Sequence, residues 1–335
     1  MRNQTLTGFV IVLSTFASAS IPTQHEHGHA HDEVEATPID HTQLSGVKLY
    51  DWLGTDGYYT EDFSNDELQK LVSEGLANED SDIVNATIGS LSWYAVHSLT
   101  QRDESGNPRF DRGLQSVPGL KQSLIDVWRA NKNEDTYPLT EEDFENSVEY
   151  RNEQLVPVPT LRLAWSFIPS TLASLFPKDQ EVHEILWDGY DPENPTTMLD
   201  WLNRGQFTTE KATKLRLELL NAVDDLSPIY AAIGLGFTES ADALAALVDR
   251  LETDPGDRVL CAHLIDSIVA HGDRAVPHLE LLRTTAQDFD LLPAEGETLE
   301  RPEGYGIKAD IGIEYRTQQA IRKLEDFAEN GSEES

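Results

Sequence analysis

The clearest chemical feature of the sequence is a run of alternating histidines near the N-terminus. It consists of four imidazoles among acidic side chains, namely His25, His27, His29 and His31 with Glu26, Asp32 and Glu33. Imidazole is a good ligand for Zn²⁺, Cu²⁺ and Ni²⁺, and an unstructured chain can bring four rings to one ion. Ordering a flexible segment costs entropy, so we expect weak binding and no required cofactor. The alternative interpretation is a solubilising tail that binds metal only in vitro.

A second set of histidines lies in the body of the chain, at His97, His263, His271 and His278. These residues form no HExxH motif and have no three-ligand spacing. We therefore interpret them as ordinary histidines at helix ends or on half-buried faces, and not as a metal site.

Aromatic and acidic residues alternate in an irregular stretch from 187 to 207. They are Trp187, Tyr190, Trp201 and Phe207, with Asp188, Asp191, Glu193 and Asp200. Aromatic rings beside carboxylates can bind and cleave sugars, but the same composition describes aromatic packing under a loop. The sequence has no Gly-rich phosphate loop and no G-x-S-x-G motif. It thus favours a non-catalytic protein, and an all-α enzyme with a site near 187–207 stays the alternative.

The stretch from Asp254 to Ala286 predicts two short antiparallel helices. Leu260, Leu264 and Ile268 recur every four residues and form an apolar stripe. We expect Asp254 to cap this helix, with Pro255 at its first position and Gly272 at its end. After a cap at Asp273, a second stripe follows, formed by Ala275, Leu279, Leu282 and Ala286. The lone cysteine, Cys261, falls on the apolar side and is expected to be a core residue.

This unit resembles a HEAT repeat through the run VLCAHLIDSIVAHGD and the start AVPHLELL. The fragment V-P-x-L also recurs at Val117, Val158 and Val276, with steps of 41 and 118 residues, which approximate one and three periods of ~40. The resemblance covers 254–286 well and the rest loosely. It implies an all-α fold of stacked antiparallel helix pairs, an irregular α-solenoid with an extended protein-binding face. It transfers no catalytic residue. An irregular all-α bundle is the alternative.

The N-terminus predicts export. Residues 1–19 combine Arg2, the apolar core FVIVLSTF and the small-residue pattern Ala17-Ser18-Ala19, as secretory signals do. We expect 20–45 to be a disordered His-rich tail, 46–330 a helical domain and 331–335 a disordered end. The mature protein would be periplasmic or extracellular and would keep no membrane span.

The formal net charge of −35 sets the class of partner. Phosphate groups would repel this surface, so we expect no binding to nucleic acid or to anionic membranes. Few lysines among many acids fit a saline habitat, where salt screens self-repulsion, or else a merely acidic protein. The prediction is a protein-binding module with a protein partner. The alternatives are a periplasmic metal-handling protein that uses its tail, and the enzyme named above.

Overall fold

The fold is all-α in the computed structural model, which describes residues 41–58, 63–100, 112–131, 167–293 and 312–331. No strand occurs in these ranges, as the sequence predicts. The chain divides into two compact units, residues 1–175 and 176–335. Within the described ranges, no helix is both long enough and apolar enough to cross a membrane.

The first unit is built on α4, a long helix of small and hydroxyl residues. The elements of this unit are η1 (His41–Gln43), α2 (Val47–Trp52), the π-helix η2 (Leu53–Gly57), α3 (Asn65–Leu76), α4 (Ser81–Thr100), η3 (Leu114–Ser116), α5 (Leu120–Asn131) and α7 (Ile168–Leu175). Ser64 and Glu67 form a capping box at the start of α3, at the spacing typical of this motif in a sequence. Buried hydroxyls on α4 find partners in other elements, for example Ser90 with Tyr58 at 3.1 Å and Ser92 with Thr171 at 2.6 Å.

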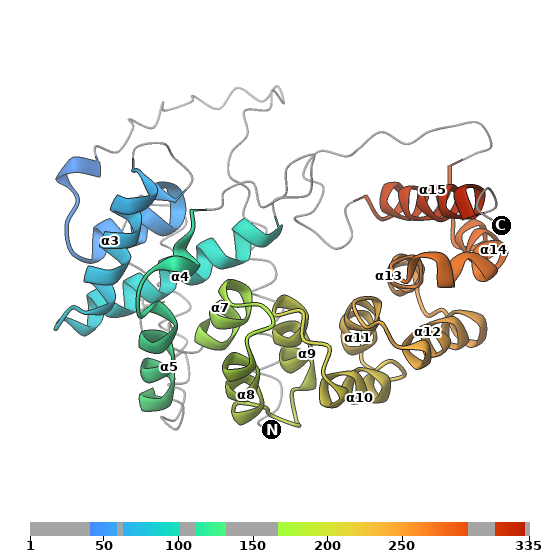
Figure 1. The fold of residues 1–335 in the computed structure, drawn as a ribbon, viewed down its shortest axis with the longest axis horizontal. Helices are drawn as coiled ribbons and strands as arrows, with labels where there is room; N and C mark the ends of the chain where they lie inside the picture. The colour runs from blue at the N-terminus through green and yellow to red at the C-terminus, as the bar shows by residue number, and fades with distance from the viewer. Residues whose placement is uncertain (1–40, 59–62, 101–111, 132–166, 294–311, 332–335) are drawn as a thin grey trace, which may run out of the picture. The chain divides into compact units, whose positions relative to one another are not determined.

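The second unit is a succession of short helices, coloured from green to red in Figure 1. They are α8 (Gln180–Asp188), α9 (Pro195–Arg204), α10 (Glu210–Leu219), α11 (Ser227–Gly236), α12 (Ala241–Thr253), α13 (Arg258–Val269), η5 (Gly272–His278), α14 (Leu279–Asp288) and α15 (Ile313–Gly331). α9, α11, α13 and α15 contact one another in turn, and α10 contacts α12. Four helices of this unit thus form a row of successive neighbours. Their assignment to the HEAT class stays a prediction.

The stretch 254–286 forms the predicted helix pair, with two corrections at its caps. Leu260, Leu264 and Ile268 are buried along α13, and Gly272 takes the left-handed conformation with φ 63°. The expected cap at Asp254 is wrong, because Gly256 turns the chain with φ 73° and the helix begins only after Asp257.

Asp257 is the true cap of α13, since its carboxylate accepts from the amides of Val259 and Leu260. The expected cap at Asp273 is also wrong. The chain enters a 3-10 turn, η5, which contains Pro277, and the α-helix begins only at Leu279. Proline lacks the N–H that a regular helix needs, which delays the start of α14.

The stretch 187–207, which the sequence predicts to be irregular, combines turns with helices. It comprises the end of α8, a short turn and the whole of α9. Pro195 occupies the first helical position, where its missing N–H costs nothing. Met198, Leu199 and Leu202 are buried along one face of α9.

Candidate functional site

None of the predicted metal ligands lies among the residues that the structure describes. His25, His27, His29 and His31 lie outside the described residues, as does the side chain of His97. The remaining body histidines do not converge, and the described residues hold no group of three metal-binding side chains.

Two of the body histidines are buried beside arginines. His263 accepts a hydrogen bond at Nδ1 from Arg316 at 3.2 Å, and His271 accepts one at Nδ1 from Arg274 at 3.1 Å. Burial, with the neighbouring guanidinium as a second cause, lowers the pKa of both rings, that of His263 to about 4. Both rings are thus buried and neutral.

The acids among the aromatic residues 187–207 do not form a catalytic pair. Asp188, Asp191 and Glu193 are exposed. Asp200 accepts from Arg204 at 2.7 Å, one turn along the same helix. The aromatic rings of this region therefore pack against one another and against His183, and its described carboxylates do not converge as a pair.

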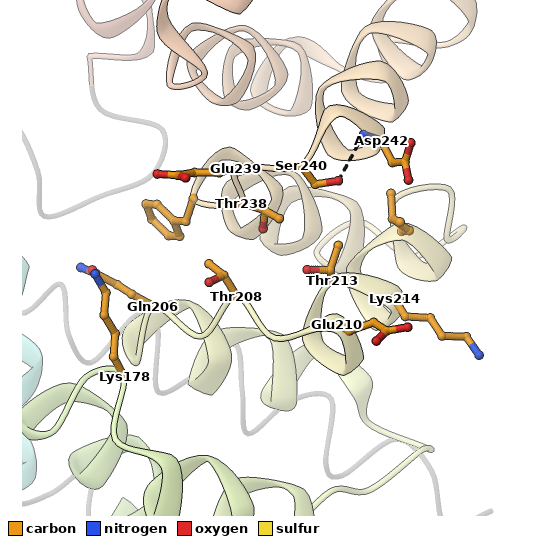
Figure 2. A pocket seen from close by; sticks show the side chains of 12 residues that line it. Lys178, Gln206, Thr208, Glu210, Thr213, Lys214, Thr238, Glu239, Ser240 and Asp242 are labelled. Carbon is orange, nitrogen blue, oxygen red and sulfur yellow. Dashed lines mark hydrogen bonds between the residues drawn. The ribbon is translucent and has the colours of Figure 1, made fainter.

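The candidate site that the structure offers is a groove of about 770 Å³ in the second unit. Figure 2 shows it between two turns, the one that joins α9 to α10 and the one that joins α11 to α12. Its lining residues are Lys178, Gln206, Thr208, Glu210, Thr213, Lys214, Leu217, Phe237, Thr238, Glu239, Ser240 and Asp242. One wall is the segment 206–210, which we call the groove wall.

Hydrogen bonds join each side of the groove to a neighbouring turn outside it. The amide of Lys178 donates to the carbonyl of Gly205 at 2.8 Å, which ties the turn before α8 to the residue that precedes the groove wall. Arg274 donates to the carbonyl of Glu239 at 3.1 Å, which ties the opposite wall to the next turn. In the described part of the chain, no hydrogen bond joins the groove wall to the turn at 237–240. The space between them is left to solvent or to a ligand.

The lining combines hydroxyls, exposed charges and one apolar ring. Four hydroxyl side chains point toward the hollow or its rim, Thr208, Thr213, Thr238 and Ser240 (Figure 2). Charged side chains of both signs stand exposed around them. Phe237, whose side chain is 46% exposed, is the aromatic residue of the lining. Such a surface suits binding better than acid–base chemistry.

The groove wall is held from behind by Arg216, which is fully buried. Its guanidinium donates to the carbonyl of Phe207 at 2.6 Å and to Oδ1 of Asn203 at 3.0 Å. Burial lowers the pKa of Arg216 to about 10, so the group keeps its charge at neutral pH. A side chain on Gly234 would collide with Arg216, and therefore α11 must carry a glycine there.

His183 supports the same wall from α8 and is 6% exposed. Its Nε2 accepts from the indole N–H of Trp187 at 2.9 Å and lies 3.1 Å from the hydroxyl of Thr209. Thr209 in turn caps α10 through the amide of Ala212. The ring packs on Phe207, with centroids 4.9 Å apart. Lys211 lies over the Trp187 ring, 3.8 Å from its centroid.

Sequence reasoning missed both supports of the groove wall. The signals were the four-residue spacing of His183 and Trp187 and the position of Arg216 beside the apolar residue Leu215. Neither signal is specific, because four-residue pairs and amphipathic arginines are common on helices. No protein-family model, curated protein or solved structure matches this chain.

Proposed function

We propose that the chain is an exported, non-catalytic protein of the HEAT-like class that binds a segment of another protein in its groove. The observation that carries this proposal is the pairing of a hydroxyl-lined groove with a half-exposed Phe237 at its edge. Hydroxyls and exposed charges can satisfy a peptide backbone, and an aromatic ring supplies an anchor for an apolar side chain.

The chemistry of the lining favours binding over turnover. Its acids, Glu210, Glu239 and Asp242, are all exposed, and no histidine or cysteine lines the groove. General acid–base catalysis depends on a positioned group of matched pKa, which buried surroundings normally provide. The excess of acids over the whole chain directs the partner choice towards proteins and away from polyanions.

A photo-crosslinking amino acid at position 237 tests the proposal in the native exported fraction. We expect one partner segment to be captured, with capture suppressed by excess wild-type protein. The matched control places the same amino acid at Val223, which is fully exposed but does not line the groove. Identical capture from both positions, or none from 237, would contradict binding in the groove.

The metal-handling interpretation is a second, separate proposal, because the four alternating histidines favour it independently of the groove. It concerns the N-terminal tail alone.

A further inference from the structure

We propose that Lys178 and Gln206 on one side of the groove, and Glu239 on the other, hold the backbone of an extended peptide segment. The inference deepens the proposed function and rests on it for the class of partner. It names the residues that select the ligand and the chemical group that they take, which is the peptide group itself.

Lys178 has a backbone conformation that favours glycine. The amide of Asp179 donates to the carbonyl of Phe176 at 3.3 Å, which closes a turn with Pro177 second and Lys178 third. Lys178 has φ 64°, in the left-handed region. A turn with proline second and a positive φ third usually has glycine at that third position, because a Cβ there crowds the backbone. The lysine side chain is thus kept at a conformational cost.

Gln206 lies at a similarly strained position, in the Schellman pattern that ends α9. The amide of Phe207 donates to the carbonyl of Leu202 at 3.0 Å. The amide of Gln206 donates to the carbonyl of Asn203 at 3.1 Å. The left-handed residue of this pattern is most often glycine, yet here it is Gln206 with φ 50°. Two of the three non-glycine residues with positive φ in the described ranges thus line the groove.

The polar ends of both side chains are available to a ligand. In the part of the chain that the structure describes, neither the ammonium of Lys178 nor the amide of Gln206 has a partner. Lys214, the other lysine of the lining, lies 3.9 Å from Glu218. Figure 2 shows Lys178 and Gln206 at the same end of the groove. Their backbones are neighbours there, because the amide of Lys178 donates to the carbonyl of Gly205.

Glu239 lies on the opposite side, in the turn between α11 and α12 (Figure 2). Its carboxylate is exposed, and no ion pair joins it to Lys178 among the described residues. A charged ligand between the two would meet one like charge, whereas a neutral dipolar group satisfies both. The other acids of the lining, Glu210 and Asp242, lie in the first turns of α10 and α12, where the helix dipole favours them.

A peptide group has the polarity that this end of the groove requires. In a trans peptide the carbonyl and the N–H point in opposite directions. The carbonyl oxygen has two lone pairs and can accept from both Lys178 and Gln206, while the N–H can donate to Glu239. An extended segment presents these groups unpaired. Phe237, which also lines the groove, supplies the contact for an apolar side chain of the segment.

The strained positions allow a test in which stability and binding separate. In the double variant Lys178→Gly with Gln206→Gly, both side chains are removed and the left-handed backbone is relieved, so the melting temperature should equal or exceed that of wild type. The photo-crosslinking amino acid at 237 reads binding, with the native exported fraction as the source of the partner. Equal capture should require about ten times more of that fraction, because hydrogen bonds to the segment are lost.

Asp290→Gly is the matched control for these glycines. Asp290 has φ 53° at the equivalent position after α14 and does not line the groove. Its replacement should leave capture unchanged. On the opposite side of the groove, Glu239→Ala should weaken capture, whereas Glu239→Gln keeps an oxygen acceptor and should restore most of it. A purely structural role would not produce this rescue.

A defined probe tests the peptide group itself. The capped peptide acetyl-Ala-Ala-Leu-Ala-Ala-amide is titrated into the full wild-type chain, and the backbone amides of Thr208 and Thr238 are followed by NMR. The matched probe has esters in place of the two amides that flank leucine, which removes the N–H donors and keeps the shape. We expect both signals to shift with the amide probe, and a dissociation constant about tenfold higher for the ester probe.

Three results would overturn the inference. They are unchanged capture in the glycine double variant, a melting temperature that falls in parallel with capture, and equal affinities of the amide and ester probes. Absence of capture by the wild-type protein would instead contradict the proposed function, and the two probes would still decide whether the groove takes a peptide group.

Discussion

Arg216 is the residue whose burial is hardest to reconcile with a purely structural core. A guanidinium without a carboxylate partner loses its hydration and receives only carbonyl and amide oxygens in return. These bonds fix two successive pieces of chain, the end of α9 and the groove wall. The hydrogen bonds of Arg216 thus compensate for part of the free-energy cost of burying its charge, and they fix the position of the groove wall.

Replacing Arg216 with alanine should destabilise the second unit by about 3–5 kcal/mol, because the carbonyl of Phe207 and the amide of Asn203 lose a charged donor in a buried place. Urea unfolding measures the loss. The control is Lys214→Ala on the same helix, whose ion pair with Glu218 at 3.9 Å is exposed and should cost about 0.5 kcal/mol or less. Equal costs for the two variants would contradict the role given to Arg216.

His263 makes the stability depend on pH in a defined direction. Its pKa in the fold is about 4, below the ordinary 6.5, so the unfolded chain binds more protons between these values. The contribution is complete above pH 6.5 and is lost as pH falls towards 4, by ~3 kcal/mol in all.

The variant His263→Gln should flatten this part of the stability profile, measured as denaturant midpoints from pH 7 to 4. A slope that is unchanged in His263→Gln would show that this ring titrates normally in the fold.

At the level of the helix, α13 is the element on which the second unit depends. It contacts α11, α12, α14 and α15, and nearly all of its side chains are buried. Changing Leu264 to aspartate places an unpaired charge in this interface, which costs several kcal/mol. We expect the unit to unfold, seen as loss of helical circular dichroism at 25 °C.

The matched control for Leu264→Asp is Ala245→Asp, at an exposed position of the neighbouring helix α12. It should lower the melting temperature by only a degree or two. A melting temperature of Leu264→Asp close to that of wild type would mean that this face of α13 is not part of the core.

The helices could be predicted from the sequence where local signals agree with the packing. Ser64 with Glu67, and the stripe of Leu260, Leu264 and Ile268, are signals of this kind. The prediction of a cap at Asp254 was wrong because Asp257 can cap the same helix. Which of the two aspartates does so depends on the conformation of Gly256. The groove could not be predicted, because it is formed by turns more than 25 residues apart whose spacing no local pattern records.

For the whole molecule, the negative charge is the dominant property. Three arginines of the second unit join elements, Arg316 with Asp266, Arg283 with Glu325 and Arg258 with Glu314. Two of these pairs link α15 to α13, at Asp266 and at Arg258, the first residue of α13. The third links α15 to α14 through Arg283. Acids such as Asp188 and Asp191 stand exposed on the surface of this unit.

Export should remove residues 1 to about 19, since the apolar segment and Ala17-Ser18-Ala19 form a cleavage pattern. Mass spectrometry of the native protein should find an N-terminus at Ser20 or Ile21. A Leu13→Arg variant, with a charge in the apolar segment, should retain the full chain and serves as the control. Native protein that begins at Met1 or Arg2 would refute export by this signal.

The mature tail should bind one divalent transition ion weakly and independently of the helical units. Its ligands must be neutral imidazoles with an ordinary pKa of ~6.5, so binding should fade as pH falls through about 6. Changing His25, His27, His29 and His31 to alanine should remove most binding in titration calorimetry with Zn²⁺ and Cu²⁺. The melting temperature of the metal-free protein should stay the same, because the tail has no apolar stripe with which to dock.

Stoichiometric binding by the quadruple variant would instead move the metal site into the helical body. Among His97, His263, His271 and His278, two are poor candidates, since Arg316 and Arg274 already donate to Nδ1 of His263 and His271. Of these four histidines, His97 and the half-exposed His278 would remain as candidates for a body site. His97 belongs to the first unit and His278 to the second. Adding His278→Ala to the quadruple variant separates these two, because only a site at His278 would then lose its metal.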